Sequence, residues 1–591
     1  MQTSNNTSLE ALSNAELTSK QIEAGEAGSQ TPQTLDVSNN NNNNQESSSN
    51  AVDSENSPPV LSDARLYVIG VGIWISLFLS AFETTVVATS LVKITSDFQD
   101  FNRASWIVVA YLLTYNGFLL LSSKLCDIVG IKTMFLAANV IFGVFSIACG
   151  ASQNMTQLII FRAFQGIGGG GIYCIAFILM MSIITKEKLG TFSGGISSVF
   201  AIASICGPLL GGVITERSTW RWIFYLNGPG VVVALVILFF SLPKVGQVKL
   251  NRETMSRIDF GGGFLSVAWS ILLVYALQEG GADYPWKSSV ILGTLISGII
   301  GLFLFAGWEW YIAKKSSVVE PIFPLRLLKS PALTYLVLTT FCIGVPIYMT
   351  IINIPQRFQV VNGVSPIRAG VLLLPMLVIS PVMSLVPGLA LKNYYLYVPY
   401  GIAVGAAFAV IGTAGLGTLG EGSTIPTKTY GFLILLGAGM GLVMPISVMV
   451  VRLIVEAKDE AVALGAQNMT RVLGGLVGLA IGTAILHQKI ENELPTVLTP
   501  EQLSSLLKSP AILASLQPQQ VVRVRDVYAR SFDLEFNMAA AFSGLSFIFG
   551  CLATYHCVKI AKTIDPNDIF NAGGPKAAAE RKNEEKKAGE V

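Results

Sequence analysis

The sequence predicts an all-α polytopic membrane protein with fourteen transmembrane helices. Of its 591 residues, 52% are apolar and only 13% are charged, and the mean hydropathy is +0.58. Soluble proteins carry about 25% charged residues, so most of this chain faces something other than water. The apolar residues form runs that reach the roughly 20 residues a helix needs to cross a bilayer. The 56 glycines suit helices that pack closely in lipid.

The fourteen apolar runs follow one another along most of the chain. They are longer than the roughly ten-residue strands of a membrane barrel and do not alternate as such strands do, so we expect helices. The thirteenth run is the least apolar, because it contains Asn468 and Arg471. The runs cover 66–91, 105–123, 133–151, 157–183, 193–215, 222–242, 260–278, 289–312, 333–354, 369–390, 396–417, 430–451, 465–486 and 537–558.

The order of the runs divides the chain into five parts. We expect residues 1–62 and 561–591, which are polar and poor in apolar residues, to be disordered cytoplasmic tails. Between them we expect a six-helix bundle at 63–243, a linker with two inserted helices at 244–330, and a second six-helix bundle at 331–560 with a long external loop at 487–536. Glycine-rich strings eight runs apart, GPLLGG and RVLGGLVG, favour such a repeat.

The distribution of charge predicts the orientation and limits the partners. Lys and Arg are more numerous in the short loops on the side of the N-terminus, which places both termini in the cytoplasm. The formal net charge of +2 gives no reason to expect a nucleic acid partner. The seven cysteines form no CxxC pair and there are only two histidines, so we expect no metal and no cofactor. We expect a monomer in the lipid bilayer.

Polar and ionisable residues inside the apolar runs are the first candidates for function, because they are rare and unfavourable in lipid. Glu83 lies in the run 66–91, Arg162 in 157–183, and Asn468 and Arg471 in 465–486. Burial favours the neutral form of a carboxyl group, so Glu83 can bind and release a proton, whereas arginine stays charged. Counted from one membrane surface, Glu83 is about 12 Å deep and Arg162 about 8 Å deep, which permits an ion pair. The alternative is that these groups form purely structural pairs.

Two further segments carry candidate conformational residues. In the run 193–215, Gly207 and Gly211 lie on one helix face, where another helix can approach closely, and Pro208 bends the helix. The polar segment after the second run places charged residues around a glycine, as a charge relay would; an ordinary positive-inside loop is the alternative. The candidate gating residues are Lys124, Asp127, Gly130, Lys132, Gly207, Pro208, Gly211 and Gly212.

One glycosylation site is expected. Asn154-Met155-Thr156 is an N-glycosylation sequon that falls in a predicted external loop. The second sequon, Asn468-Met469-Thr470, lies within a predicted span and is expected to remain unmodified. No GxxxxGK[ST], HExxH or GxSxG motif is present, so the sequence does not predict an enzyme.

These motifs resemble the major facilitator superfamily, and specifically its fourteen-helix drug:proton antiporter branch, over residues 64–560. The family carboxylate motif of the first helix reads here from Glu83 to Val92, with Glu in place of the usual Asp and Val in place of the usual Pro. Arg162, Gln165 and Gly166 match R-x-x-Q-G, and Gly207-Pro208 with Gly211-Gly212 match the antiporter motif, with Ala203 in place of its leading Gly.

The loop motif of the family, G-x-L-x-D-x-x-G-R-[KR], is matched only in part. Leu125, Asp127, Gly130 and Lys132 agree with it, whereas Ser123 replaces the first Gly and Ile131 replaces the Arg. The missing arginine affects part of the charge relay that the family uses.

The resemblance implies proton-coupled export of small, largely apolar or amphipathic molecules, such as a drug, toxin or secondary metabolite, by alternating access. It also implies a plasma-membrane location and a transport site that includes Glu83, Arg162, Gln165, Asn468 and Arg471. Alternatives are a proton-coupled importer or a vacuolar carrier, for a siderophore or a basic amino acid, and a membrane receptor that does not transport.

Overall fold

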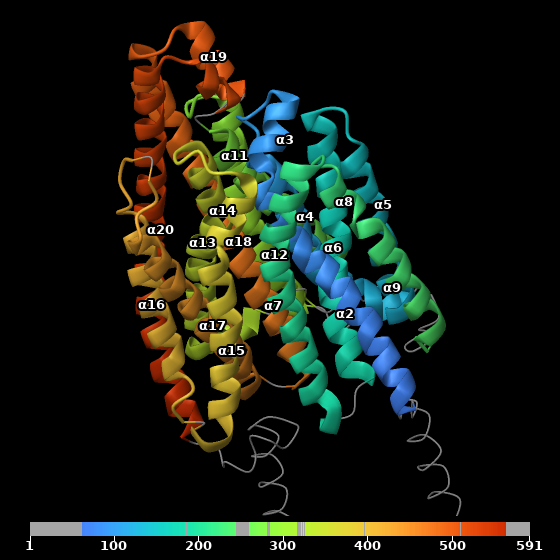
Figure 1. Ribbon diagram of the computed structural model, residues 1–591. Coiled ribbons are helices and arrows are strands. Elements are labelled where there is room, and N and C mark those ends of the chain that lie inside the picture. Colours follow the sequence, from blue (N-terminus) through green and yellow to red (C-terminus); the bar gives the residue numbers. More distant parts are fainter. Residues whose placement is uncertain are drawn as a thin grey trace, which may run out of the picture. The chain divides into compact units, whose positions relative to one another are not determined.

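The computed structural model describes residues 62–562, with gaps at 184–185, 244–258, 281–283, 316–318, 320, 322, 324, 395, 423, 456 and 509. The described residues are almost entirely helical (Figure 1). Twelve of their helices are long and apolar enough to cross a membrane, and two shorter apolar stretches, Trp106–Leu119 and Tyr400–Leu416, coincide with the two remaining predicted spans. The all-α membrane fold is confirmed, and the expected fourteen spans are compatible with it.

The N-terminal half begins with α2, Asp63–Val86, whose apolar sequence continues through a short 3-10 turn, η1, into α3. Gly130 separates the next two helices with a φ of +89°, a backbone conformation that favours glycine. The elements are η1 Val87–Thr89, α3 Leu91–Phe98, α4 Trp106–Val129, α5 Ile131–Ala151, α6 Met155–Ile183, α7 Lys186–Arg217, α8 Trp222–Tyr225 and α9 Asn227–Ser241.

Two helices lie between the halves in the sequence: α11, Phe260–Glu279, and α12, Ser289–Lys315. Asp259 caps α11, because its Oδ1 accepts a hydrogen bond from the Gly262 amide at 2.7 Å. The same oxygen accepts one from Trp308 Nε1 of α12, also at 2.7 Å, which ties the two helices together. Of the pair, α11 packs on α4 and α18, whereas most of the apolar surface of α12 is left for lipid.

The C-terminal half contains the longest helices. Its first helix, α13, starts at a proline in the position where proline is favoured, after Ser330. The elements are η2 Leu325–Lys329, α13 Pro331–Val360, α14 Pro366–Leu372, α15 Leu374–Tyr394, α16 Tyr400–Leu416, α17 Lys428–Ile454, α18 Ala457–Glu493, η3 Leu494–Thr496, α19 Pro500–Lys508, η4 Pro510–Ser515 and α20 Pro518–Ala561.

The segment 487–536, expected to be a loop, is mostly helical. The last turns of α18 and the first part of α20 extend into it, and η3, α19 and η4 connect them. Apolar residues of this segment, such as Leu494, Leu506 and Val527, bury themselves against one another and against Phe101 of the N-terminal half. Hydropathy alone missed these helices because their mixed composition resembles that of a soluble protein.

The two halves repeat the same packing. In the N-terminal half α2 packs on α7 and α9, α6 packs on α4 and α5, and α5 packs on α9. In the C-terminal half α13 packs on α18 and α20, α17 packs on α15 and α16, and α16 packs on α20. Contacts between the halves are reciprocal too, because α4 meets α18 and α7 meets α14 and α15.

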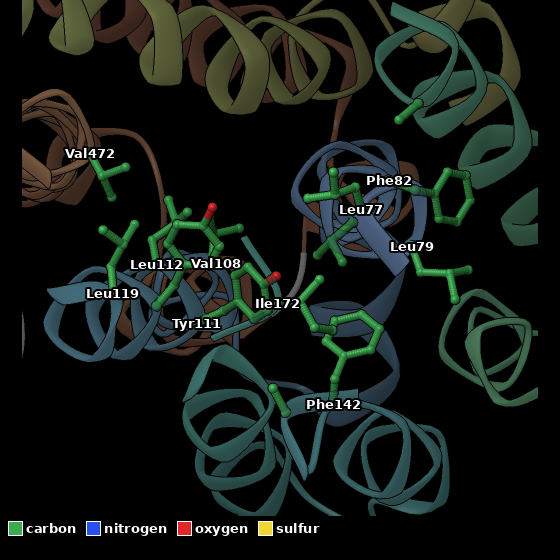
Figure 2. Close-up of a cluster of buried hydrophobic side chains, with 14 of the residues drawn as sticks. Leu77, Leu79, Phe82, Val108, Tyr111, Leu112, Leu119, Phe142, Ile172 and Val472 are labelled. Carbon is green, nitrogen blue, oxygen red and sulfur yellow. The ribbon is translucent and has the colours of Figure 1, made fainter. Parts of the chain in front are cut away.

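The largest apolar core contains residues from every helix of the N-terminal half, from α2 to α9. Figure 2 shows Leu77 and Phe82 of α2 together with Leu112 of α4, Phe142 of α5 and other side chains. Val472 of α18 belongs to the same cluster, so the core continues into the C-terminal half. The predicted tails, 1–62 and 561–591, lie outside the described residues except for 62, 561 and 562.

Candidate functional site

The candidate site is built around Glu83, which is fully buried near the C-terminal end of α2. Arg162 of α6 forms an ion pair with it, because Arg162 Nη1 donates to Glu83 Oε1. Asn227, the first residue of α9, donates from Nδ2 to the other carboxylate oxygen, Oε2, at 2.6 Å. The pair that the helix depths permit is therefore present, and together with Asn227 it joins α2, α6 and α9.

Several groups hold the guanidinium of Arg162 in place. Its Nε donates to the Ile107 carbonyl oxygen at 2.9 Å, and its Nη1 also donates to Gln165 Oε1 at 2.9 Å. Its Cζ lies 4.3 Å from the centroid of the Tyr111 ring and 5.7 Å from that of Phe224. Aromatic faces attract a cation, most strongly away from water. The arginine is therefore held by neutral groups in addition to the carboxylate.

A second layer of polar groups surrounds the pair. Asn227 Nδ2 also donates to Ser146 Oγ at 2.9 Å, and that hydroxyl donates to the Phe224 carbonyl oxygen at 2.9 Å. Gln165 Nε2 and Asn227 Oδ1 are buried without a hydrogen-bond partner in the described part of the chain. Unsatisfied buried polar atoms are uncommon in folded proteins and mark places where water or a ligand is accommodated or where groups rearrange.

Arg471 and Asn468 of α18 form a separate group. Arg471 Nη2 donates to Asn468 Oδ1 at 2.5 Å, and Arg471 Cζ lies 5.8 Å from the centroid of the Tyr348 ring. Within the described residues no carboxylate forms an ion pair with Arg471.

The glycines of α7 pack on two different partners. A Cβ at Gly207 would collide with Thr85, and a Cβ at Gly211 would lie 2.7 Å from Thr89 Oγ1, so both contact the end of the first helix in the same half. Gly212 instead faces the C-terminal half, where its Cβ would lie 2.7 Å from the Pro366 carbonyl oxygen. Of the three glycines, only Gly212 therefore contacts the other half.

Pro208 completes the contact between the halves. Its carbonyl oxygen lies against Gly370 of α14, so closely that a Cβ at Gly370 would overlap it. Like Gly207 of α7, which packs on the first helix of its own half, Gly478 of α18 packs on α13, the first helix of the C-terminal half. A Cβ at Gly478 would lie 2.8 Å from Val345 Cγ1. The two glycine-rich strings noted in the sequence thus occupy equivalent positions in the repeated packing.

Lys132, in the first turn of α5, contacts the end of another helix. Lys132 Nζ donates to the carbonyl oxygens of Phe239 at 2.7 Å and Leu242 at 2.6 Å, at the end of α9. A cation there satisfies carbonyls that a helix end leaves unpaired. The side chains of Lys124 and Asp127 lie outside the described residues, so the proposed relay through Asp127 stays a prediction.

Asn154 is exposed at the start of α6, where its Oδ1 accepts a hydrogen bond from the Gln157 amide at 2.9 Å. It therefore caps this helix while remaining accessible, and its glycosylation stays a prediction. Among the described residues no group of three His, Cys, Asp or Glu side chains could hold a metal ion.

Two buried polar residues of the structure were not predicted from the sequence. Asn227 is the only amide in its apolar run, which was a usable signal. Glu535 is fully buried on α20, where Asn353 Nδ2 donates to its Oε2 at 2.6 Å. It was missed because it precedes the apolar run 537–558 and was assigned to a loop.

Comparisons with known proteins agree with this arrangement. The family model described as "Major Facilitator Superfamily" matches residues 73–479. The MFS-type transporter FPY5 of Fusarium mangiferae is 40% identical over 489 residues, which are 81% of this chain and 82% of that protein. The multidrug transporter protein MdtP of Bacillus subtilis is 30% identical over 431 residues, 73% of this chain and 77% of that protein.

A solved structure shares the fold. It is a bacterial homolog of the human lysosomal transporter Spinster, with a TM-score of 0.60 and 14% identity, and the match covers 85% of this chain and 99% of that one. The repeated packing of the two halves, the long family match and these relatives lead to one conclusion: the chain belongs to the Major Facilitator Superfamily.

Proposed function

We propose that this protein is a proton-coupled secondary transporter that exports small, largely apolar or amphipathic molecules, such as drugs, toxins or secondary metabolites. The observation that carries the proposal is the buried Glu83–Arg162 pair, which is hydrogen-bonded to Asn227 and lies where α2, α6 and α9 meet. The names of relatives support the direction of transport, since they include the efflux pump FUS6 of Gibberella moniliformis, which is 30% identical over 502 residues.

Protonation of Glu83 removes the negative charge that is paired with Arg162. The buried arginine is stabilised by the negative charge of the carboxylate, and removing that charge leaves the guanidinium with only neutral partners. The backbone carbonyl of Ile107, the amide of Gln165 and the Tyr111 ring then hold the arginine, and the contact between α2 and α6 weakens. Loss of the proton restores the pair. This exchange couples the protonation of one carboxyl group to the relative positions of two helices.

The contact between α7 and α14 supplies a gate between the halves. Gly212 and Gly370 let the two backbones approach closely, without side chains that would have to be displaced. We propose that this contact closes the side of the membrane opposite the termini and that it opens when α7 moves away from α14. We also propose a plasma-membrane location with both termini in the cytoplasm.

The test uses inverted membrane vesicles. Untargeted mass spectrometry of medium from cells with and without the protein identifies an exported compound, and uptake of that compound into the vesicles is measured with and without a pH gradient. Glu83→Gln is expected to abolish the dependence on the gradient while the protein still folds, because the amide has the shape of a neutral carboxyl group. Glu83→Asp is expected to keep partial coupling, because it retains an ionisable group.

Arg162→Lys is the second variant. Lysine keeps the charge but cannot donate to Glu83, Gln165 and the Ile107 carbonyl from one planar group, so transport is expected to fall severely. Gradient-dependent uptake at the wild-type level in the Glu83→Gln protein would place the coupling group elsewhere. A compound that accumulates in cells because of this protein would favour the importer.

A further inference from the structure

A second buried carboxyl group, Glu535, has no role in the mechanism above. Its side chain lies in α20 with 1% of its surface exposed. Asn353 of α13 donates to its Oε2 at 2.6 Å, and no described residue donates a hydrogen bond to its Oε1. Among the described residues it forms no ion pair, which distinguishes it from Glu83. An unpaired buried carboxylate is unfavourable, and the neutral acid is the form that burial tolerates.

The arrangement of Glu535 repeats that of Glu83 with the partners exchanged. In the N-terminal half the first helix, α2, carries the carboxyl group and α9 carries the amide of Asn227. In the C-terminal half the equivalent first helix, α13, carries the amide of Asn353 and α20 carries the carboxyl group. Glu83 and Asn353 lie at comparable heights, about 30 Å and about 33 Å from the starts of their helices.

Glu535 faces a small cavity of about 30 Å³ between the halves. The cavity walls come from α13, α18 and α20, and from the turn at Phe101 to Ser105 in the N-terminal half. Polar groups on the wall include Asn102, Gln356 and Thr483. Binding sites for drug-sized molecules measure several hundred Å³, whereas a cavity of about 10–15 Å³ by the same measure already holds one water. The cavity therefore suits water and a proton rather than an exported molecule.

The other ionisable groups around Glu535 belong to separate contacts or share the cavity. His487 of α18 lines the same cavity. Arg357 of α13 forms an ion pair with Asp533, two residues before Glu535, at 3.5 Å, and it also donates to the Gly420 carbonyl oxygen. Further groups on α18, α20 and the adjoining turn are paired with one another: Lys489 and Arg530 with Glu493, Arg530 with Glu421, and Arg103 with Asp100. The helix α16 contributes no Asp, Glu, Lys, Arg or His.

We propose that Glu535 is a second proton-binding site of the transport cycle, loaded from water in the cavity between the halves. A hydronium ion in the cavity gives its proton to a carboxylate oxygen and leaves water, and the reverse step returns the proton to water. Asn353 donates to Oε2 in both states, so the proton is carried on Oε1. When the turn at 101–105 moves away with the N-terminal half, the cavity opens and the exchange proceeds. The inference rests on proton-coupled transport as its setting, but it concerns a different residue.

The experiment needs no substrate. The full-length protein is placed in lipid nanodiscs, and infrared difference spectra are recorded between alkaline and acidic buffer, in which buried protonated carboxyl groups give a C=O band. The wild-type spectrum is expected to contain a band that disappears in Glu535→Gln. Asn353→Leu removes the hydrogen bond to Oε2 and is expected to shift that band without removing it. Glu501→Gln, which changes an exposed carboxyl group of α19, is the matched control and is expected to leave the band unchanged.

The outcomes separate this inference from the proposed function. A band lost in Glu83→Gln but present in Glu535→Gln contradicts the second site and leaves the role of Glu83 intact. A band lost in Glu535→Gln supports the second site whatever Glu83→Gln shows. An unchanged band in Glu535→Gln, together with loss of binding of ethidium as a cationic probe, would make Glu535 a substrate contact and overturn the proposal. Each variant is first checked for a monodisperse elution profile and wild-type thermal unfolding.

Discussion

Substitution of Gly212 by alanine tests whether the α7–α14 contact is a gate. The new Cβ would lie 2.7 Å from the Pro366 carbonyl oxygen and 2.8 Å from Ile367 Cα, whereas ordinary contacts start at 3.4 Å. Both obstacles are backbone atoms, so no rotamer change relieves the overlap, and the helices must separate by about 0.7 Å (3.4 − 2.7). Overpacking of this kind costs about 1–3 kcal/mol. If only the closed state contains the contact, its population relative to the open state falls roughly 5- to 150-fold.

Hydrogen–deuterium exchange measures this shift on the full-length protein in nanodiscs. Amides at the C-terminal end of α7 and in α14 exchange through opening of the contact, so their exchange is expected to accelerate by about the same factor. Gly307→Ala on α12 is the matched control, because nothing lies within 4 Å of its Cβ, and it is expected to behave as wild type. Unchanged exchange in α7 and α14 of a folded Gly212→Ala protein would refute the gate.

Four other substitutions have distinct expected outcomes. Gly207→Ala overlaps Thr85 within one half, so its thermal unfolding temperature is expected to fall while exchange in α14 stays at the wild-type level. Lys132→Met removes two hydrogen bonds to the end of α9 and is expected to destabilise the protein by about 1–3 kcal/mol, measured by thermal unfolding. Arg471→Gln is expected to impair vesicle transport with little change in unfolding temperature, since no described carboxylate depends on it. Asn154→Gln is expected to increase gel mobility as much as enzymatic deglycosylation does; no shift with either treatment would mean that the sequon is not used.

The fold could be predicted because the bilayer imposes a length and a composition on each spanning segment. Every helix recognised by its apolar run reappears in the structure, and the pairing of GPLLGG with RVLGGLVG anticipated the repeated packing of α7 and α18. Hydropathy failed where the helices leave the lipid. The N-terminal part of α20 is packed against other protein segments, as the buried Val524 and Tyr528 show, and its sequence carries the mixed pattern of a soluble helix.

The candidate site could be predicted in part. Glu83 and Arg162 were found because charge inside an apolar run is conspicuous, and their depths agreed. Their neutral partner Asn227, the only amide in the run 222–242, was not found, because an uncharged amide stands out less than a charge does. The packing partners of the α7 glycines could not be predicted from the sequence either. Gly207 and Gly212 are five residues apart, so they point to different sides of the helix, but the sequence does not say which neighbour occupies each side.

Because α20 is one continuous long helix, a movement at one of its ends is transmitted to the other end. It runs for 44 residues from Pro518 to Ala561 without an internal proline, which corresponds to about 66 Å of helix. A rotation of one degree about one end displaces the other end by about 1 Å. Small tilts of α20 at one end therefore become larger displacements at the other end. Val522 is exposed and lies about 20 Å along the helix from Glu535, outside the cavity, so a fluorescent probe there would report rearrangements around Glu535.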